Sequence, residues 1–271
     1  MTVTDAAFDW VREVVANDAA IVLEPGKEYL VETRLAPLAR AAGQAGVTAY
    51  IDQARTSADR QARARIVDAL TTNETSWFRD GTPFQALERE IVPALAASRA
   101  ITRTVRIWSA ACSTGQEPYS IAMVLRDTVG AQGWHCQVLG TDLSPTVLEQ
   151  ARQGLYNQVE MNRGLPASKL ISHFSRDGMR WRINDELRSL VSFRELNLAR
   201  PLPPLGQFDV VFLRNVLIYF SVETRRQILQ RVRAACRPDG YLVLGSAETT
   251  LGVDDRWRLV RLGTSTVYQP A

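Results

Sequence analysis

Histidine, cysteine and lysine are scarce in this 271-residue chain. The scarcity of histidine and cysteine excludes several kinds of metal site and a disulfide framework. Only His135 and His173 are present, so the sequence cannot supply a multi-histidine metal centre. The three cysteines, Cys112, Cys136 and Cys236, stand apart without a C-x-x-C spacing, which predicts reduced thiols rather than disulfides or zinc ligands. We therefore expect neither a bound metal nor a fold that depends on disulfides.

Long apolar segments are also lacking. No uninterrupted apolar stretch approaches the roughly 20 residues that cross a bilayer. The N-terminal segment carries acidic side chains from Asp5 onward and lacks the basic start and apolar block of a signal peptide. With 46% apolar and 23% charged residues, the composition is that of a globular protein. We expect a cytoplasmic protein without membrane insertion.

Positive charge is carried almost wholly by arginine, because lysine occurs only at Lys27 and Lys169. A net charge of +3 is too small to indicate nucleic-acid binding, and no such partner is expected. Residues 34–65, however, hold six arginines against two aspartates. This segment is either a solvated helical surface or a docking surface for an acidic partner. Its second half contains Arg55, Arg60, Arg63 and Arg65.

Two hydrophobic periodicities divide the chain. Residues 1–70 carry apolar side chains at helical spacing, which predicts a small all-helical domain whose second helix is kinked or split by Pro37. From about Val105, β-rich segments alternate with amphipathic helices, which predicts a parallel sheet covered by helices on both faces. The expected strands are Val105–Ala110, Gln137–Thr141, Phe208–Leu213 and Tyr241–Gly245, and the expected helices span 118–127, 145–153 and 222–236.

Two segments break this alternation. Residues 165–195 contain strand-like pieces at Met179–Ile183 and Leu190–Phe193 around polar turns, which predicts a small antiparallel β insertion. Trp257–Tyr268 has no helix between its strand-like halves and predicts a closing hairpin. The expected organisation is a helical domain at 1–70, a linker carrying part of the active site at 71–100, and a doubly wound α/β domain at 101–271.

Residues after two predicted strands indicate a nucleoside ligand, because open α/β sheets bind ligands beyond the carboxyl ends of their strands. Glu117 starts the helix after the first strand and would repel a pyrophosphate. Asp142 follows the second strand, where its oxygens can accept hydrogen bonds from a ribose diol. Each residue alone could be part of an ordinary turn or helix start. Together they favour S-adenosylmethionine, with Asp142 on the adenosine and Glu117 on the amino group.

Two further segments bear on the active site. The strand at Phe208–Leu213 runs into a loop that would hold Asn215 and Tyr219 at the same sheet edge. The sequence lacks the Asn/Asp-Pro-Pro-aromatic and Pro-Cys signatures that are expected of nucleobase methyltransferases, so a nucleobase is a less favoured target. Upstream, residues 71–80 combine hydrogen-bonding side chains with two aromatics and Arg79. Thr71 and Glu74 could form a capping box there. The composition is more typical of an active-site rim.

In this order, the segments resemble those of the CheR-type chemotaxis receptor methyltransferases over essentially the whole chain. The most specific parts of the resemblance are 71–80, Trp108–Ser120, Gly140–Ser144 and Arg214–Phe220. It implies a Rossmann-like S-adenosylmethionine-dependent methyltransferase fold with a closing antiparallel hairpin. It also implies a protein-glutamate O-methyltransferase that esterifies the methylation helices of membrane chemoreceptors for sensory adaptation, with S-adenosylhomocysteine as the second product.

The resemblance assigns roles to matching positions. Arg79 and Tyr219 would lie nearest the reacting methyl group. The arginines of the helical domain would meet receptor glutamates. Cofactor contacts are implied for Asn73, Thr75, Arg79, Glu117, Asp142, Asn197, Leu198, Arg214 and Asn215.

Two departures from the family pattern matter. Gln116 stands where the family often has a second acid, which would weaken the hold on the cofactor slightly. The segment at 174–184 is shorter than in members that grip a pentapeptide at the receptor's C-terminus, so we expect a tether-independent enzyme. The alternatives are a methyltransferase of another carboxylate, a non-catalytic cofactor-binding adaptor and, less favoured, a nucleic-acid methyltransferase. A monomer is compatible with the sequence, which leaves the oligomeric state open.

Overall fold

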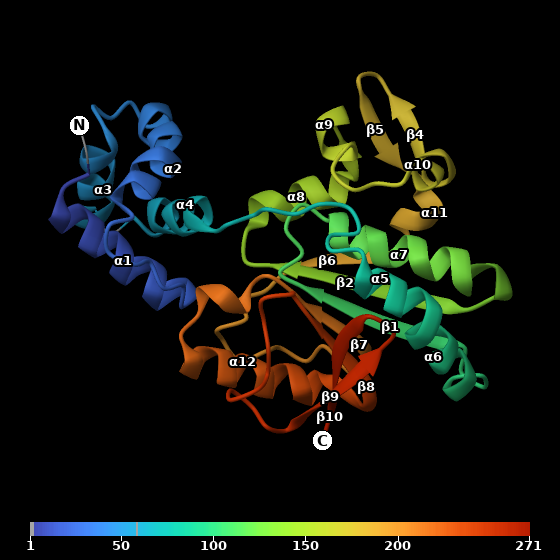
Figure 1. Ribbon diagram of the computed structural model, residues 1–271. Helices are drawn as coiled ribbons and strands as arrows, with labels where there is room; N and C mark the ends of the chain where they lie inside the picture. The colour runs from blue at the N-terminus through green and yellow to red at the C-terminus, as the bar shows by residue number, and fades with distance from the viewer. Residues whose placement is uncertain (1–2, 58) are drawn as a thin grey trace. The chain divides into compact units, whose positions relative to one another are not determined.

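The computed structural model describes residues 3–57 and 59–271 and forms two compact units (Figure 1). One unit contains the chain up to Thr72 together with Tyr219–Thr224. The other contains Asn73–Ile218 and Arg225–Ala271. No helix within the described residues is long and apolar enough to cross a membrane.

Amphipathic helices build the first unit. Their apolar faces meet in a single core, in which Val11, Leu35, Ile51 and Ile66 are fully buried. This burial is what the helical spacing of the apolar residues predicts. The helices are α1 (Asp5–Ala19), α2 (Glu28–Ala41), α3 (Val47–Thr56) and α4 (Arg60–Leu70).

We expected Pro37 to kink or split the second helix, and it does not split it. Helix α2 continues through Pro37 to Ala41. A proline removes one backbone hydrogen bond and crowds the preceding turn. Val31, Leu35 and Ala39 nevertheless remain buried along one face of the helix. Packing of this face against the core holds the helix together across the missing bond.

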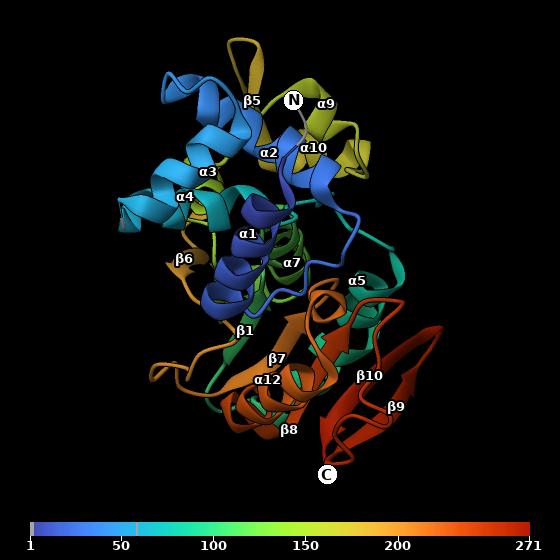
Figure 2. The same cartoon turned by 90° about the vertical axis from the view of Figure 1, so that its left-hand side faces the viewer.

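A seven-stranded sheet in the order β6-β2-β1-β7-β8-β10-β9 forms the centre of the second unit. Neighbouring strands from β6 to β8 run parallel, whereas β10 is antiparallel to both β8 and β9. The predicted strands and the closing hairpin are therefore confirmed, and Figure 2 shows the β9–β10 hairpin at one edge of the sheet. The strands are β1 (Thr104–Ala110), β2 (His135–Asp142), β6 (Val191–Glu195), β7 (Phe208–Leu213), β8 (Cys236–Leu244), β9 (Trp257–Leu262) and β10 (Ser265–Pro270).

The direction of winding reverses between β1 and β7. The chain leaves β1 through α7 (Gln116–Thr128) toward β2, and it leaves β7 through α12 (Val222–Ala235) toward β8, on the opposite side. Because such crossovers are right-handed, α7 and α12 cover opposite faces of the sheet, as Figure 1 shows. Reversal points of this kind open a ligand-binding crevice at the carboxyl ends of the strands.

The β insertion differs from our prediction at both ends. Its antiparallel sheet has the order β3-β5-β4 and begins at Leu155. The expected strand Leu190–Phe193 is not part of it, because β6 (Val191–Glu195) pairs in parallel with β2. Sequence periodicity identifies a strand but not the sheet that it joins. The insertion comprises β3 (Leu155–Tyr156), β4 (Phe174–Asp177) and β5 (Arg180–Ile183), with α9 (Gln158–Met161), α10 (Ala167–His173) and α11 (Asp185–Arg188) nearby in sequence.

Residues 71–100 were expected to form a linker, but all of them from Asn73 onward lie within the second unit. Trp77 is 1% exposed and meets the rings of Tyr156 and Phe174 edge-on, with centroids 4.9 and 5.3 Å away. Phe84 and Leu87 are buried in the same core. The segment is therefore anchored on the sheet domain by aromatic packing. It contains α5 (Thr82–Ala86), a π-helical turn (Leu87–Ile91) and α6 (Val92–Ser98).

Candidate active site

The carboxyl ends of the parallel strands are level with one another. Ala110 at the end of β1 pairs with Thr141 of β2 and Leu213 of β7, and Leu213 pairs with Leu244 of β8. On the other side, Asp142 pairs with Glu195 of β6. The residues that follow these strands therefore gather along one edge of the sheet. They include the predicted cofactor ligands Asp142, Asn197, Leu198, Arg214 and Asn215.

The turn after β1 is tightly constrained. Ala111, Ser113 and Gly115 all have positive φ, at 65°, 50° and 95°. A Cβ on Gly115 would lie 2.9 Å from the Ala151 Cβ and 3.0 Å from the Tyr156 hydroxyl oxygen. Left-handed non-glycine residues persist only where surrounding structure holds them, and they cluster at functional sites. This backbone is therefore shaped in advance at the edge where a ligand would bind.

Backbone N–H groups from two turns hold the side chain of Asp142. Its side chain accepts hydrogen bonds from the Ser113 N–H (2.8 Å) and the Ser144 N–H (3.0 Å). The residue is only 7% exposed. Ser144, rather than Asp142, caps helix α8 (Pro145–Gln153) by accepting from the Val147 N–H at 3.3 Å. The carboxylate is thus oriented by its neighbours and has acceptor capacity beyond two hydrogen bonds.

The loop after β6 is attached to the same residue. The Leu196 N–H donates to the Asp142 peptide oxygen at 2.8 Å. Asn197 turns the chain there, because its side-chain oxygen accepts from the Ala199 N–H at 2.9 Å. Leu198 is 7% exposed. The structure therefore brings Asn197 and Leu198 to the edge that holds Asp142.

Glu117 and Arg214 form the largely buried centre of an ionic cluster. The Arg214 side chain is 1% exposed, and its Nη1 donates to Glu117 Oε2 at 2.9 Å. Its Nη2 donates to Asp80 Oδ2 (2.7 Å) and to the Arg79 peptide oxygen (2.9 Å). Glu117 Oε1 also accepts from the Ser109 hydroxyl at 2.7 Å. One guanidinium facing two carboxylates leaves a net negative charge, which suits a cationic ligand.

Arg79 lies in a loop that is docked on the sheet domain. Its neighbours Phe78 and Asp80 have positive φ, at 47° and 68°. The Phe78 N–H donates to the Ser120 hydroxyl of α7 at 3.1 Å. The Arg79 Nη1 donates to the Glu74 peptide oxygen at 3.0 Å. The peptide of Arg79 is therefore tied to Arg214, and its guanidinium stays within its own loop.

Asn73 and Thr75 line a small polar cavity of about 210 Å³ together with Thr114 and Gln116. Gln116 is 3% exposed, and its side-chain oxygen accepts from the Thr114 hydroxyl at 2.7 Å. The Asn73 peptide oxygen accepts from the Ser113 hydroxyl at 2.8 Å. The start of the Arg79 loop is thereby joined to the turn after β1. The neutral Gln116 contributes no charge to this cavity.

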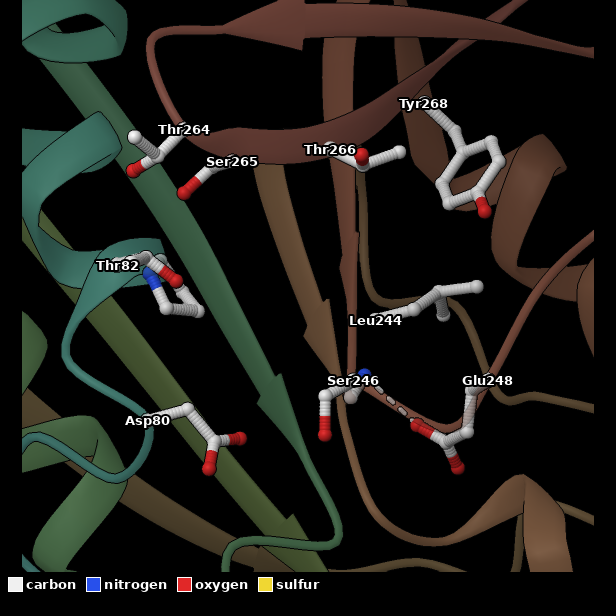
Figure 3. Close-up of a pocket in the computed structure, with 11 residues that line it drawn as sticks. Asp80, Thr82, Leu244, Ser246, Glu248, Thr264, Ser265, Thr266 and Tyr268 are labelled. Atoms are coloured by element: carbon white, nitrogen blue, oxygen red, sulfur yellow. Dashed lines mark hydrogen bonds between the residues drawn. The ribbon is translucent and has the colours of Figure 1, made fainter.

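A second cavity of about 350 Å³ lies beside the ionic cluster (Figure 3). Hydroxyl side chains and two carboxylates, Asp80 and Glu248, line it, and none of its described lining residues is basic. The Ser265 hydroxyl is shielded from solvent without a hydrogen-bond partner in the described chain. A carboxylate placed here would meet like charge, so this cavity does not suit an acidic group.

Tyr219 belongs to the first unit. Its peptide oxygen accepts from the Val22 N–H at 2.9 Å, and the adjacent Phe220 bridges Ile21. The structure does not bring Tyr219 together with Arg79 within one unit. Its place beside the reacting group therefore stays a prediction.

Three of the four predicted docking arginines form ion pairs within the described residues. Arg63 makes two hydrogen bonds to Asp18, at 2.6 and 3.0 Å, and so links α4 to α1. Arg60 is exposed and has no charged partner among the residues described. The other two form exposed ion pairs, Arg55 with Asp52 at 2.9 Å and Arg65 with Asp59 at 3.8 Å. Exposed pairs of this kind are weak, so both arginines can exchange partners at little cost.

The cysteines are free and buried. Burial raises the pKa of Cys136 to about 11 and that of Cys236 to about 12, so both thiols are protonated at neutral pH. In the described part of the chain, His, Cys, Asp and Glu side chains form no group of three that could hold a metal ion.

Two residues of this site, Asp80 and Glu248, were not predicted from the sequence as site residues. Asp80 lies in the 71–80 segment, whose polar composition was the available signal, but its pairing with Arg214 spans the fold. Glu248 follows β8, and its sequence neighbours give no sign of its partners.

Family comparisons cover nearly the whole chain. Residues 6–71 match the family model described as "CheR methyltransferase, all-alpha domain". Residues 73–265 match the model described as "CheR methyltransferase, SAM binding domain". The boundary between these two matches falls where the two structural units meet in sequence.

Full-length relatives carry consistent names. "Chemotaxis protein methyltransferase 1" of Pseudomonas aeruginosa is 39% identical over 274 residues, covering 99% of each chain. "Chemotaxis protein methyltransferase" of Vibrio parahaemolyticus is 36% identical over 273 residues, covering 99% of this chain and 98% of the relative. The protein of the same name from Escherichia coli is 34% identical over 265 residues, covering 96% and 90%.

Proposed function

The chain belongs to the CheR family of S-adenosylmethionine-dependent chemotaxis methyltransferases, and we propose that its acceptors are glutamate side chains on the methylation helices of membrane chemoreceptors. The products would be glutamate methyl esters and S-adenosylhomocysteine, formed in the cytoplasm. The observation that most supports this proposal is the similarity along the full chain to proteins named chemotaxis protein methyltransferases. The net negative Glu117–Arg214–Asp80 cluster supports the choice of methyl donor. The methyl donor is a cation, and such a cluster favours its binding.

The residues at the sheet edge fit this cofactor. Asp142 would accept from the ribose hydroxyls, and Glu117 would face the amino group. When bound, the cofactor supplies an electrophilic methyl group on a positively charged sulfur. The remaining contacts would come from Asn73, Thr75, Arg79, Asn197, Leu198, Arg214 and Asn215.

The acceptor needs no general base. A glutamate side chain has a pKa of about 4.3 and is ionised at neutral pH. One oxygen of the acceptor carboxylate would take the methyl group, and the sulfur would keep the electron pair of the bond that is broken. Opposite charges are neutralised in this step, so surrounding water would oppose it. The protein's contribution is orientation and exclusion of water.

Arg79 and Tyr219 would provide that orientation. We propose that Arg79 holds one oxygen of the acceptor carboxylate while the other attacks. Its guanidinium is bound only to the Glu74 peptide oxygen in the second unit and can exchange that partner. Tyr219 would donate a hydrogen bond to the acceptor or close the pocket.

The test measures base-labile label, released as methanol, from chemoreceptor membranes incubated with methyl-labelled cofactor. Release should require the receptor, and Arg79→Ala should reduce turnover at saturating cofactor by on the order of 100-fold through lost orientation. Arg89→Ala, at an exposed arginine of the π-helical turn, is the matched control and should retain full turnover.

Other results would separate the alternatives. Full turnover by Arg79→Ala would contradict the role of Arg79. Release from a different acceptor, without receptor, would indicate another carboxylate substrate. Cofactor binding without any transfer to receptors that carry unmodified glutamates would indicate an adaptor.

We also propose that docking uses the exposed arginines and no receptor tether. Arg60 is available for a receptor glutamate without breaking an ion pair, and Arg55 and Arg65 can join it. The β4–β5 hairpin turns within two residues, because Asp177 pairs directly with Arg180. Its short turn supports a tether-independent enzyme.

A binding titration with the receptor's cytoplasmic fragment tests both points. Arg60→Glu should weaken binding by roughly threefold to tenfold, because exposed charge pairs contribute up to about 1 kcal/mol and reversal adds repulsion. Added salt should weaken binding further. Removing the fragment's last five residues should have no effect. Measurable affinity for the isolated pentapeptide would contradict tether-independent docking. Binding that does not depend on ionic strength would contradict docking through the arginines. Arg89→Glu is the charge-matched control for Arg60→Glu.

A further inference from the structure

We propose that Glu248 is a positioning residue, which fixes the Arg214–Asn215 loop for cofactor binding and methyl transfer. The proposal rests on the proposed function in taking Arg214 and Asn215 as part of the active site. Glu248 lies between β8 and β9, outside every motif on which the family resemblance depends.

A single carboxylate accepts four backbone hydrogen bonds. Glu248 Oε2 accepts from the N–H groups of Asn215 (2.7 Å) and Gly245 (2.8 Å). Oε1 accepts from the N–H groups of Val216 (2.9 Å) and Leu217 (2.7 Å). The side chain thus joins the loop after β7 to the loop after β8, and a dashed line at Glu248 in Figure 3 marks one of these bonds.

Three consecutive N–H groups of the β7 loop point to one anion. Asn215 has φ of 56°, and a left-handed residue of this kind turns successive N–H groups toward a common point. Ligand-binding loops in other folds use this arrangement to hold phosphate. Here the protein supplies its own anion, so the loop shape is set before any ligand binds.

Gly245 shows how closely the two loops approach. A Cβ at this position would lie 2.7 Å from Glu248 Oε2 and 2.9 Å from the Asn215 nitrogen. No other residue would leave room for the carboxylate between the loops. Independently of the hydrogen bonds, the glycine therefore indicates that this junction is closely built.

The arrangement favours positioning over direct chemistry. Glu248 lines the cavity of Figure 3, but each of its oxygens already accepts from two donors. It holds the peptide next to Arg214, whose guanidinium contacts Glu117 and Asp80. A displaced loop would move that guanidinium, and small displacements of orienting groups strongly reduce turnover.

Glu248→Gln is the direct test. Its amide NH₂ replaces one acceptor oxygen and faces two backbone donors. We expect weaker S-adenosylmethionine binding by calorimetry and a fall in kcat on the order of 100-fold. Glu248→Asp keeps the charge on a shorter side chain and should restore part of both.

Asp209→Asn provides a matched control at the other end of β7. Asp209 is a fully buried carboxylate that accepts from the Arg106 N–H (2.8 Å) and Arg99 Nε (3.0 Å). This variant should lower the melting temperature while the folded protein keeps its cofactor affinity and kcat. A merely structural Glu248 would give the same pattern.

If Glu248→Gln, like Asp209→Asn, lowered only the melting temperature and left cofactor affinity and kcat unchanged, the proposal would be overturned. If Glu248→Gln does not fold, Glu248→Asp with normal affinity and kcat would overturn it as well. Failure of the wild-type protein to methylate receptors would contradict the proposed function alone, because cofactor affinity still reports on the loop.

Discussion

Replacing Arg214 with methionine is expected to abolish methyl transfer and to destabilise the second unit. The guanidinium is 1% exposed and bonds to Glu117, Asp80 and the Arg79 peptide oxygen. Without it, the Glu117 carboxylate remains largely buried and uncompensated. Breaking a buried ion pair from one side costs about 3–5 kcal/mol. Calorimetric unfolding and cofactor titration measure the two effects separately.

A double variant distinguishes charge from shape. Glu117→Gln in the Arg214→Met background removes the uncompensated charge, so it should recover part of the lost stability without recovering activity. Arg214→Lys retains the charge but not the planar fork that reaches three partners, and it should be intermediate. An Arg214→Met protein with normal stability and cofactor affinity would show that the cluster is dispensable.

Gly164→Ala is expected to have the largest effect of any added methyl group that we consider. Gly164 has φ of 92°, and a Cβ there would lie 2.3 Å from the Trp77 peptide oxygen. That neighbour is backbone, which is held by the Trp77 N–H bond to the Arg163 peptide oxygen at 3.0 Å. Left-handed strain of about 1–2 kcal/mol and overpacking of about 1–3 kcal/mol should combine. The clash would also displace the loop that carries Arg79.

Gly178→Ala is its matched control. Gly178 has φ of 58° at the tip of the β4–β5 hairpin, and a Cβ there would meet no atom within 4 Å. Only the backbone strain of about 1–2 kcal/mol should remain, and cofactor affinity should be unchanged. Urea unfolding of both variants checks the difference. Equal losses of stability would show that the approach to Trp77 relaxes freely.

Local patterns predicted most of the fold. The strands Val105–Ala110 and Phe208–Leu213 are present within a residue of their expected bounds, and helix α8 has its expected bounds. Alternation and turn residues are properties of neighbouring positions, so a sequence displays them directly. The pairing of strands is different, because it depends on residues that are far apart in the sequence. For that reason Leu190–Phe193 was assigned to the wrong sheet, although it was correctly predicted as a strand.

The family, the parallel sheet and the residues at the ends of its strands can be predicted from the sequence, because they depend on local periodicity and on motifs in a fixed order. The partners of those residues become visible only in the folded chain. Glu117 meets Arg214 across 97 positions, and Glu248 meets Asn215 across 33. The sequence shows that each of the two glutamates carries a carboxylate. Its partner depends on strand order and register, which bring distant loops to one edge of the sheet.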